Sequence, residues 1–205
     1  MLGILARKLG MSSFFENGVK VPCTFIKSED CRVTQVKTKE RDGYSAVQLA
    51  FGNKKSKNST LALMGHFKKY GVPCKLCLRE IKNFDKELKA GDLVAFEDVF
   101  HEGDYIKATG LSKGKGFQGV VKRHGFSGVG GQTHGQANRL RAPGSVGASS
   151  FPSRVFKGLR MAGRMGGGQV TVRNLRVLKI LAKENILIVK GCVPGFNNSV
   201  VVLKK

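Results

Sequence analysis

The sequence has no acidic side chain over more than a third of its length. Not one Asp or Glu occurs from residue 105 to residue 183, although that span holds fifteen Lys and Arg. Soluble surfaces normally mix charges of both signs, because like charges repel one another and destabilise a compact state. The one-sided charge therefore predicts a polyanionic partner that neutralises this span, and nucleic acid has that chemistry.

The same span also lacks the apolar periodicity of a folded core. Its larger apolar residues are too sparse and irregular to bury one another, whereas glycine recurs throughout. Glycine lets the backbone adopt positive φ and approach a ligand without interference from a Cβ atom. A disordered basic tail would lie at a terminus, but strands flank this segment on both sides. The pattern therefore favours a ribbon that follows a defined path between RNA helices.

The number of cysteines and the lack of long apolar runs limit where the protein can be located. The five Cys are an odd number, which argues against a closed set of disulfides and favours a reducing compartment. No apolar run is long enough to span a membrane, and Arg7 and Lys8 interrupt the apolar start of the chain too early for a signal sequence. We expect a cytoplasmic protein with no membrane partner.

The formal net charge of +22 is divided unevenly along the chain. Residues 1–104 carry a net charge of +5, and residues 105–205 carry +17. Basic side chains that neutralise phosphates release condensed counterions, so the affinity for nucleic acid should fall as salt rises. No recognition helix for a DNA major groove is visible, and an irregular ribbon suits the shape of folded RNA better than duplex DNA.

Outside the basic span the pattern predicts many short strands. Residues 19–27 and 32–38 predict a hairpin, and residues 93–100 predict a strand paired with residues 105–111. One short helix is predicted at residues 61–70, ahead of Gly71 and Pro73. The remaining predicted strands cover residues 44–51, 76–84, 170–181, 186–193 and 200–203.

This succession predicts a mainly β fold built on a β-barrel. Residues 1–112 would form the first part of the barrel, with residues 52–92 as an inserted subdomain, and residues 170–205 would complete it. Residues 113–169 would form one long basic loop between the two parts. A loop of this length without its own core is uncommon unless it is a binding element.

Two short motifs suggest chemistry that their surroundings do not support. Gly114, Gly116 and Gly119 match G-x-G-x-x-G, but a dinucleotide site needs an acidic residue about twenty positions later, and none follows before Glu184. Cys74 and Cys77 form a lone C-x-x-C, for which Cys23, Cys31 and His66 are the nearby further ligands at irregular spacing. We therefore expect no cofactor, no metal and no small-molecule substrate.

The histidines and phenylalanines of the basic span leave alternatives open. A catalytic His124 or His134 would need a carboxylate or nucleophile, and the span offers no carboxylate, so contact with RNA or simple solvation is expected. The phenylalanines could stack on bases or pack locally. For Phe126 and Phe156 local packing is expected, the latter because it lies beside Val155; Phe117 and Phe151 remain open.

Short motifs occur in a set order along the whole chain. Examples are Lys8-Leu9-Gly10-Met11, Arg32-Val33-Thr34-Gln35-Val36-Lys37, Ser112-Lys113-Gly114-Lys115-Gly116-Phe117, Pro143-Gly144-Ser145, Val155-Phe156-Lys157-Gly158 and Val193-Pro194-Gly195. In these motifs the chain resembles the bacterial form of the ribosomal protein L3 family, also called uL3. Each motif is weak alone, and their order makes the resemblance specific.

The resemblance implies a translation-protein-type β-barrel with a small α+β insertion and a long extension. It also implies a structural protein that binds 23S rRNA early in assembly beside neighbouring ribosomal proteins, with its extension directed toward the peptidyl-transferase centre. Many bacterial members carry a methylated Gln shortly after the position of Gly147, where this chain has Ala148-Ser149-Ser150, so that modification is not expected. The tip would comprise Pro143, Gly144, Ser145, Gly147, Ala148, Ser149 and Ser150.

The sequence thus predicts an RNA-binding ribosomal protein with no catalysis of its own. A nucleotide-using enzyme is one alternative, and a free RNA chaperone or nucleoid protein is another. The residues expected to contact rRNA are Lys113, Lys115, Lys122, Arg123, His124, His134, Arg139, Arg141, Arg154, Lys157, Arg160 and Arg164.

Overall fold

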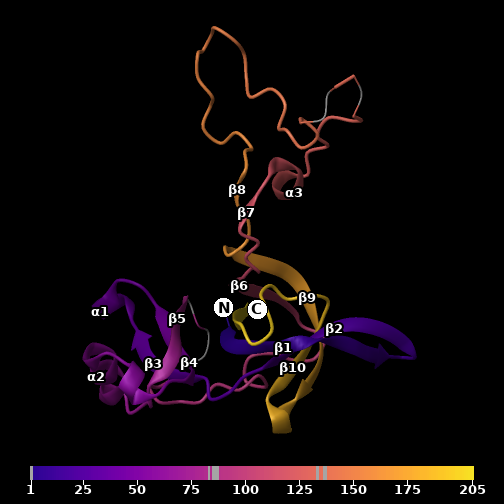
Figure 1. Ribbon diagram of the computed structural model, residues 1–205. Helices are drawn as coiled ribbons and strands as arrows, with labels where there is room; N and C mark the ends of the chain where they lie inside the picture. Colours follow the sequence, from indigo (N-terminus) through magenta and orange to yellow (C-terminus); the bar gives the residue numbers. More distant parts are fainter. Residues whose placement is uncertain (1, 83, 85–87, 133, 136–137) are drawn as a thin grey trace. The chain divides into compact units, whose positions relative to one another are not determined.

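The computed structural model of the chain describes residues 2–82, 84, 88–132, 134–135 and 138–205. The fold is mainly β, as the sequence predicted (Figure 1). The chain divides into two compact units, which we call unit 1 and unit 2. Unit 1 comprises Met1–Ser112 with Gln169–Lys205, and unit 2 comprises Lys113–Gly168.

Six strands of unit 1 form a closed barrel in the order β1-β11-β6-β9-β10-β2. Every neighbouring pair is antiparallel. Alternation along β11 sends Val201 and Leu203 into the core and leaves Val200 and Val202 half-buried, as a strand with one covered face requires. The strands are β1 (Gly3–Glu16), β2 (Val19–Lys27), β6 (Tyr105–Leu111), β9 (Gln169–Leu181), β10 (Ile186–Lys190) and β11 (Val200–Lys204).

A second, three-stranded sheet in unit 1 has the order β3-β4-β5. Its central strand β4 is buried on both faces: Leu49 and Phe51 join the core shared with the barrel, and Ala50 packs with Phe67 of α2. The Thr60 hydroxyl caps α2 by accepting a hydrogen bond from the backbone N–H of Leu63 at 3.4 Å. The elements are β3 (Arg32–Lys37), α1 (Lys39–Asp42), β4 (Ala46–Asn53), the 3-10 turn η1 (Ser56–Asn58), α2 (Leu61–Lys69) and β5 (Lys75–Lys82). A further 3-10 turn, η2 (Ala182–Glu184), joins β9 to β10.

The predicted hairpin between residues 19–27 and 32–38 is wrong. Both segments are strands, but β2 pairs with β1 and β10, whereas β3 pairs with β4. Because both edges of β2 are already occupied, β3 has no edge of β2 to pair with. The second sheet therefore begins at β3, whereas the strand pattern predicts that residues 32–51 belong to the barrel.

The predicted strand at residues 93–100 is also wrong. Leu93 makes one isolated bridge to Arg32, and the chain then turns, with the N–H groups of Val99 and Phe100 donating to the Phe96 carbonyl. The apolar residues of this turn, Val94 among them, are buried in the core of unit 1. The expected partner β6 pairs instead with β9 and β11. The apolar residues at 93–100 therefore reflect burial in the core and not a β-strand.

A buried lysine of β5 links the second sheet to the segment between β2 and β3. The Lys75 ammonium is fully buried and bonds to the Asp30 carboxylate and, at 2.9 Å, to the Asn53 side-chain oxygen. Arg32 also donates to Asp30 at 2.6 Å. Burial acts to raise the pKa of Asp30, but the hydrogen bonds from Lys75 and Arg32 outweigh it, so this pKa lies below the ordinary aspartate value. Asp30 is therefore a stabilising carboxylate.

Replacing Asp30 by Ala should destabilise unit 1 by roughly 3 kcal/mol, because it leaves the buried Lys75 charge without its anion. Urea unfolding followed by circular dichroism measures the loss. The matched control is Glu29→Ala, which removes an exposed ion pair with Lys27 (3.3 Å) and should cost less than about 1 kcal/mol. Equal effects of the two changes would contradict this account.

The pH dependence of the same variant gives a second readout. A carboxylate whose folded-state pKa is lowered stabilises the fold above its unfolded-state pKa. That contribution is lost as the pH falls through the folded-state value. The stability of the unchanged protein should therefore fall in acid more steeply than that of Asp30→Ala.

Candidate nucleic-acid interface

Unit 2 is held together at its base by a short antiparallel ladder. β7 (Phe117–Gln118) pairs with β8 (Gly163–Arg164). Two backbone hydrogen bonds of 2.9 Å extend the ladder, from the Lys115 N–H to the Met165 carbonyl and from the Met165 N–H to the Gly116 carbonyl. We call residues 113–118 with 163–168 the neck. A five-residue helix, α3 (Val120–His124), follows β7 and ends at Gly125 in the left-handed conformation.

The neck requires glycine at one position in particular. Gly166 has φ +71°, and a Cβ atom there would overlap the backbone carbonyl oxygen of Lys113. A backbone oxygen cannot move aside as the end of a side chain can, so any larger residue forces the two segments apart.

Replacing Gly166 by Ala should therefore open the neck. We expect faster hydrogen exchange at the amides of Lys115 and Met165, which the ladder protects, by an order of magnitude or more for roughly 1–3 kcal/mol of backbone strain. Gly114→Ala is the matched control, since an added Cβ at Gly114 meets nothing within 4 Å. Unchanged exchange in Gly166→Ala would show that the close approach is not needed.

The residues predicted to contact RNA lie along unit 2, and most are exposed to solvent. Arg123 and His124 differ, because they are half-buried and share a backbone partner. The Arg123 guanidinium donates to the Met161 carbonyl at 2.6 Å, and Nε2 of His124 lies 3.0 Å from the same oxygen. These two residues therefore join α3 to the returning chain. The exposed members are Lys113, Lys115, Lys122, His134, Arg139, Arg141, Arg154, Lys157, Arg160 and Arg164.

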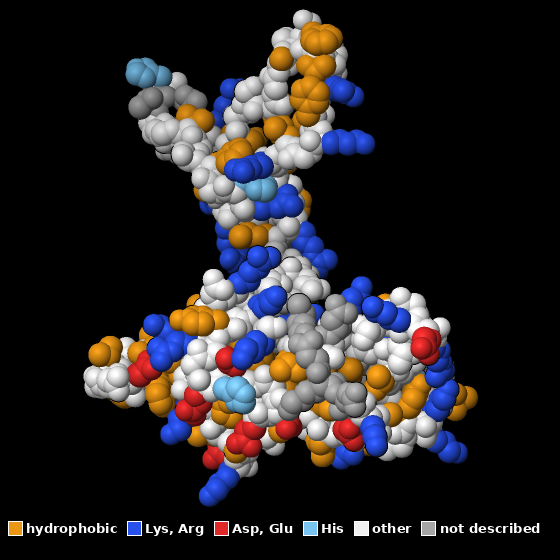
Figure 2. Space-filling model, turned by 180° about the vertical axis from the view of Figure 1, so that it is seen from behind, with side chains coloured by type: hydrophobic (Ala, Val, Ile, Leu, Met, Phe, Trp, Pro, Cys, Tyr) orange, Lys and Arg blue, Asp and Glu red, His pale blue; other side chains and the backbone are white. Residues whose placement is uncertain are grey.

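The charge of unit 2 has no internal compensation. Residues 113–168 contain no Asp or Glu, and Figure 2 shows blue side chains without red ones over this unit. Some cations of unit 1, in contrast, pair with carboxylates: Lys37 with Glu80 at 2.8 Å and Lys205 with Asp104 at 2.6 Å. Such ion pairs belong to unit 1, whereas the exposed cations of unit 2 remain available to an external anion.

The predicted tip is exposed along its whole length. Pro143, Gly144, Gly147 and the three following residues all face solvent. The Ser145 hydroxyl donates to the Gly147 carbonyl at 3.1 Å and lies 3.4 Å from the Gly147 N–H, which makes a local turn. A cavity of about 390 Å³ lies between residues 125–129 and 142–144. None of the side chains of residues 143–150 is buried in a hydrophobic core.

The phenylalanines of unit 2 divide between packing and exposure. Phe126 is half-buried, with its ring centroid 6.1 Å from that of His124, in keeping with local packing. The prediction of local packing for Phe156 is wrong, because 61% of this side chain is exposed and the Arg154 guanidinium lies over its ring at 5.5 Å. Its apolar neighbour Val155 is itself exposed, so no cluster forms there.

Comparison with known proteins identifies the family of the chain. The family model described as ribosomal protein L3 matches residues 77–185, which include all of unit 2. The large ribosomal subunit protein uL3 of Salinibacter ruber is 53% identical over 204 residues, covering 99% of this chain and 98% of that protein. The chain belongs to the ribosomal protein L3 family.

The L3-family assignment leaves the other candidate sites without support. G-x-G-x-x-G begins in the neck at Gly114, ends at Gly119, and is followed by a helix of only five residues. Within the described ranges, no group of three or more His, Cys, Asp or Glu could hold a metal. Cys74 and Cys77 are half-buried, and burial raises the pKa of the Cys77 thiol. None of the described helices is long and apolar enough to cross a membrane.

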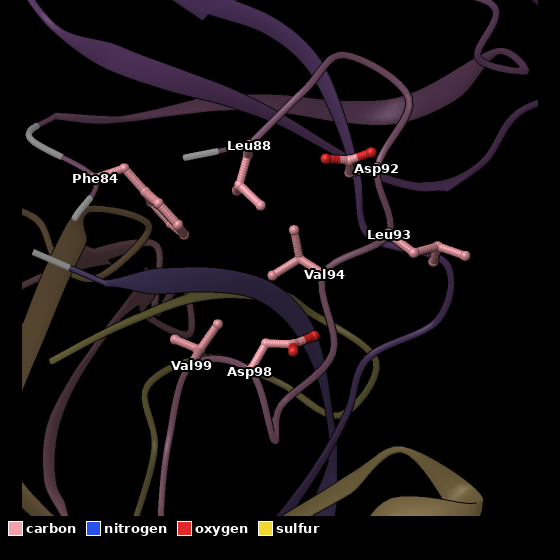
Figure 3. Close-up of a pocket in the computed structure, with 7 residues that line it drawn as sticks. All are labelled: Phe84, Leu88, Asp92, Leu93, Val94, Asp98 and Val99. Atoms are coloured by element: carbon pink, nitrogen blue, oxygen red, sulfur yellow. The ribbon is translucent and has the colours of Figure 1, made fainter. Parts of the chain in front are cut away.

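A further cavity lies in unit 1. It has a volume of about 240 Å³ and is lined mainly by apolar side chains with two carboxylates, Asp92 and Asp98 (Figure 3). Both carboxylates hold turns: Asp92 accepts the Lys89 N–H at 2.7 Å and Asp98 the Ala95 N–H at 3.1 Å. Its anionic and apolar lining does not suit a nucleotide phosphate.

Protease sensitivity should differ sharply between the two units of the free L3-family chain. Among the described residues of unit 2, only Val120 is buried, so little apolar burial opposes chain entropy there. Limited trypsin digestion should cut first within residues 113–168 and spare the barrel. Added rRNA should slow those cuts. Equal resistance of both units in the free protein would contradict the expectation.

Proposed function

We propose that unit 2 binds 23S rRNA directly, that the protein supports early assembly of the large subunit, and that its tip reaches toward the peptidyl-transferase centre. Membership of the L3 family makes the chain a structural constituent of the large ribosomal subunit. The observation that carries the proposal is the row of exposed cations in a unit with no carboxylate.

Phosphate neutralisation supplies the affinity in this mechanism. Each Lys or Arg that meets a phosphate releases condensed counterions, and the backbone contacts set the position of the protein on the RNA. Glycines such as Gly116 and Gly166, both at positive φ, let the chain turn sharply with little bulk. Arg123 and His124 act chiefly by joining α3 to the chain at Met161, which orients the surrounding cations.

The proposed division of labour assigns residues 1–112 and 170–205 to the barrel and to the second sheet, which begins at β3, and residues 113–169 to the rRNA-binding loop. Unit 1, which carries all the carboxylates, would meet neighbouring ribosomal proteins. The protein would work in the cytoplasm as part of the ribosome, without a cofactor, a metal or a reaction of its own.

Sedimentation of cell extract tests this proposal. The tagged protein should stay with large subunits on a gradient after a moderate-salt wash. Release into the unbound fractions would instead support a free RNA chaperone or nucleoid protein. Thermal unfolding of the free protein with and without ATP or NAD separates the enzyme alternative, because a structural protein should show no nucleotide-dependent stabilisation.

A further inference from the structure

Unit 2 exposes aromatic rings among its cations. Phe117 is 77% exposed and Phe156 is 61% exposed. Water contact with a phenyl ring is unfavourable, and the local structure leaves most of each ring in contact with solvent. Both rings therefore have exposed surface that a partner could contact. Because unit 2 carries cations and no carboxylate, that partner should be an anion.

Phe117 and Phe156 each have an arginine beside them, whereas among the described residues no such partner is found for Phe151, which is 87% exposed. Phe117 of β7 is directly opposite Arg164 of β8, and residues opposite one another in an antiparallel ladder share a face. The Arg154 guanidinium lies over the Phe156 ring, 5.5 Å from its centroid. Both arginines are exposed, and unit 2 offers neither of them a carboxylate. The same combination of one ring with one cation therefore occurs twice.

We propose that Phe117 with Arg164, and Phe156 with Arg154, are two stacking sites for unpaired nucleobases of single-stranded RNA. The ring stacks on the base, and the arginine neutralises an adjacent phosphate. An A-form duplex keeps its bases paired and stacked, so these rings cannot take them from it. The inference rests on the proposed RNA-binding role of unit 2 and adds that part of the bound RNA is unpaired.

An exposed ring elsewhere in the chain shows whether exposure alone is enough for base stacking, or whether the neighbouring arginine is also needed. Phe196 of unit 1 is also exposed, at 55%, but residues 191–199 contain no charged side chain, and the nearby Lys8 is buried and donates to the Val193 and Gly195 carbonyls. An exposed ring without an exposed cation beside it should bind a base poorly, because nothing holds the flanking phosphate. Phe196 is thus the matched control for both stacking sites.

The absence of tryptophan from the chain makes the test direct. Phe117→Trp, Phe156→Trp and Phe196→Trp each create a protein with a single tryptophan, whose fluorescence is quenched when a base stacks on it. The probe is oligoadenylate RNA of roughly twelve nucleotides, a length within the range that single-stranded sites cover. Inorganic polyphosphate supplies the same charge without bases, and a duplex RNA of equal length supplies paired bases.

Oligoadenylate should quench the tryptophan at positions 117 and 156 and leave position 196 unchanged. Polyphosphate and duplex RNA should bind without quenching. In addition, Phe117→Ala and Phe156→Ala should each weaken oligoadenylate binding about five-fold or more, whereas the polyphosphate affinity stays the same. Circular dichroism of each variant excludes a folding defect.

Three adverse results have different meanings. If labelled oligoadenylate binds but no quenching occurs at positions 117 and 156, or if polyphosphate quenches equally, the stacking sites are overturned while RNA binding by unit 2 stands. If oligoadenylate, duplex RNA and polyphosphate all fail to bind, the proposed function itself fails. Quenching at position 196 as strong as at the other two would show that exposure alone explains the effect.

Discussion

Neutralising four cations of unit 2 should lower the salt dependence of rRNA binding by about three units of log affinity against log salt. The variant replaces Arg154, Lys157, Arg160 and Arg164 by Gln. All four side chains are exposed in a unit without a carboxylate, so each is available to a phosphate. Each lost contact removes roughly 0.7–0.9 of a unit from the slope, because that many fewer counterions are released. Filter binding to 23S rRNA over a salt series measures the slope.

The control for this variant removes the same charge from unit 1. Lys55, Lys57, Lys68 and Lys69 are also exposed, and their replacement by Gln lowers the net charge equally. If only the total charge of the protein matters, the two variants will show the same slope. If unit 2 makes the phosphate contacts, the control will keep the slope of the unchanged protein. An unchanged slope in the unit 2 variant would rule out its four cations as contacts.

Deleting residues 142–156 should block the formation of active subunits without preventing the protein from binding. The deleted part of unit 2 is exposed apart from the half-buried Ala142 and Pro152, and it contains a single cation, Arg154. The barrel loses nothing from its core, because the core residues lie in unit 1. Folding and first contact with rRNA should therefore persist, whereas late maturation or peptide-bond formation should fail.

Gradient sedimentation of ribosomal particles, from extracts of cells in which this variant is the sole copy of the protein, measures the defect. We expect incomplete particles, or full-size subunits with little peptidyl-transferase activity. A second variant with a Gly/Ser segment of equal length in place of residues 142–156 distinguishes the need for these side chains from the need for chain length. Full-size subunits with normal activity from the deletion would show that the tip is dispensable.

The strands with a regular pattern could be located from the sequence. Alternating or continuous apolar runs placed β2, β9 and β10 to within a few residues, and Gly71 correctly marked the end of α2. Pairing was less accessible, because it depends on which strand edges are already occupied. The false hairpin between β2 and β3 arose in this way. The apolar run at residues 93–100 misled for a related reason: it is buried by other elements rather than by a sheet of its own.

The exposed cations of the candidate interface could be predicted largely from the amino-acid composition of residues 113–168. A span without carboxylates leaves its cations uncompensated wherever the backbone goes, so the exposure of Lys115 or Arg160 needed no coordinates to predict. The shared contact of Arg123 and His124 with the Met161 carbonyl was not visible, since it joins positions almost forty residues apart. The pairing of Phe117 with Arg164 was hidden for the same reason.

Ultraviolet crosslinking of native large subunits tests the central claim most directly. The crosslinked peptides would be identified by mass spectrometry, and their positions would report which part of the chain touches rRNA. We predict that the crosslinks fall mainly within residues 113–168, with Phe117 and Phe156 among the modified sites. Crosslinks confined to unit 1, with none in residues 113–168, would contradict the proposal that this unit is the RNA-binding element.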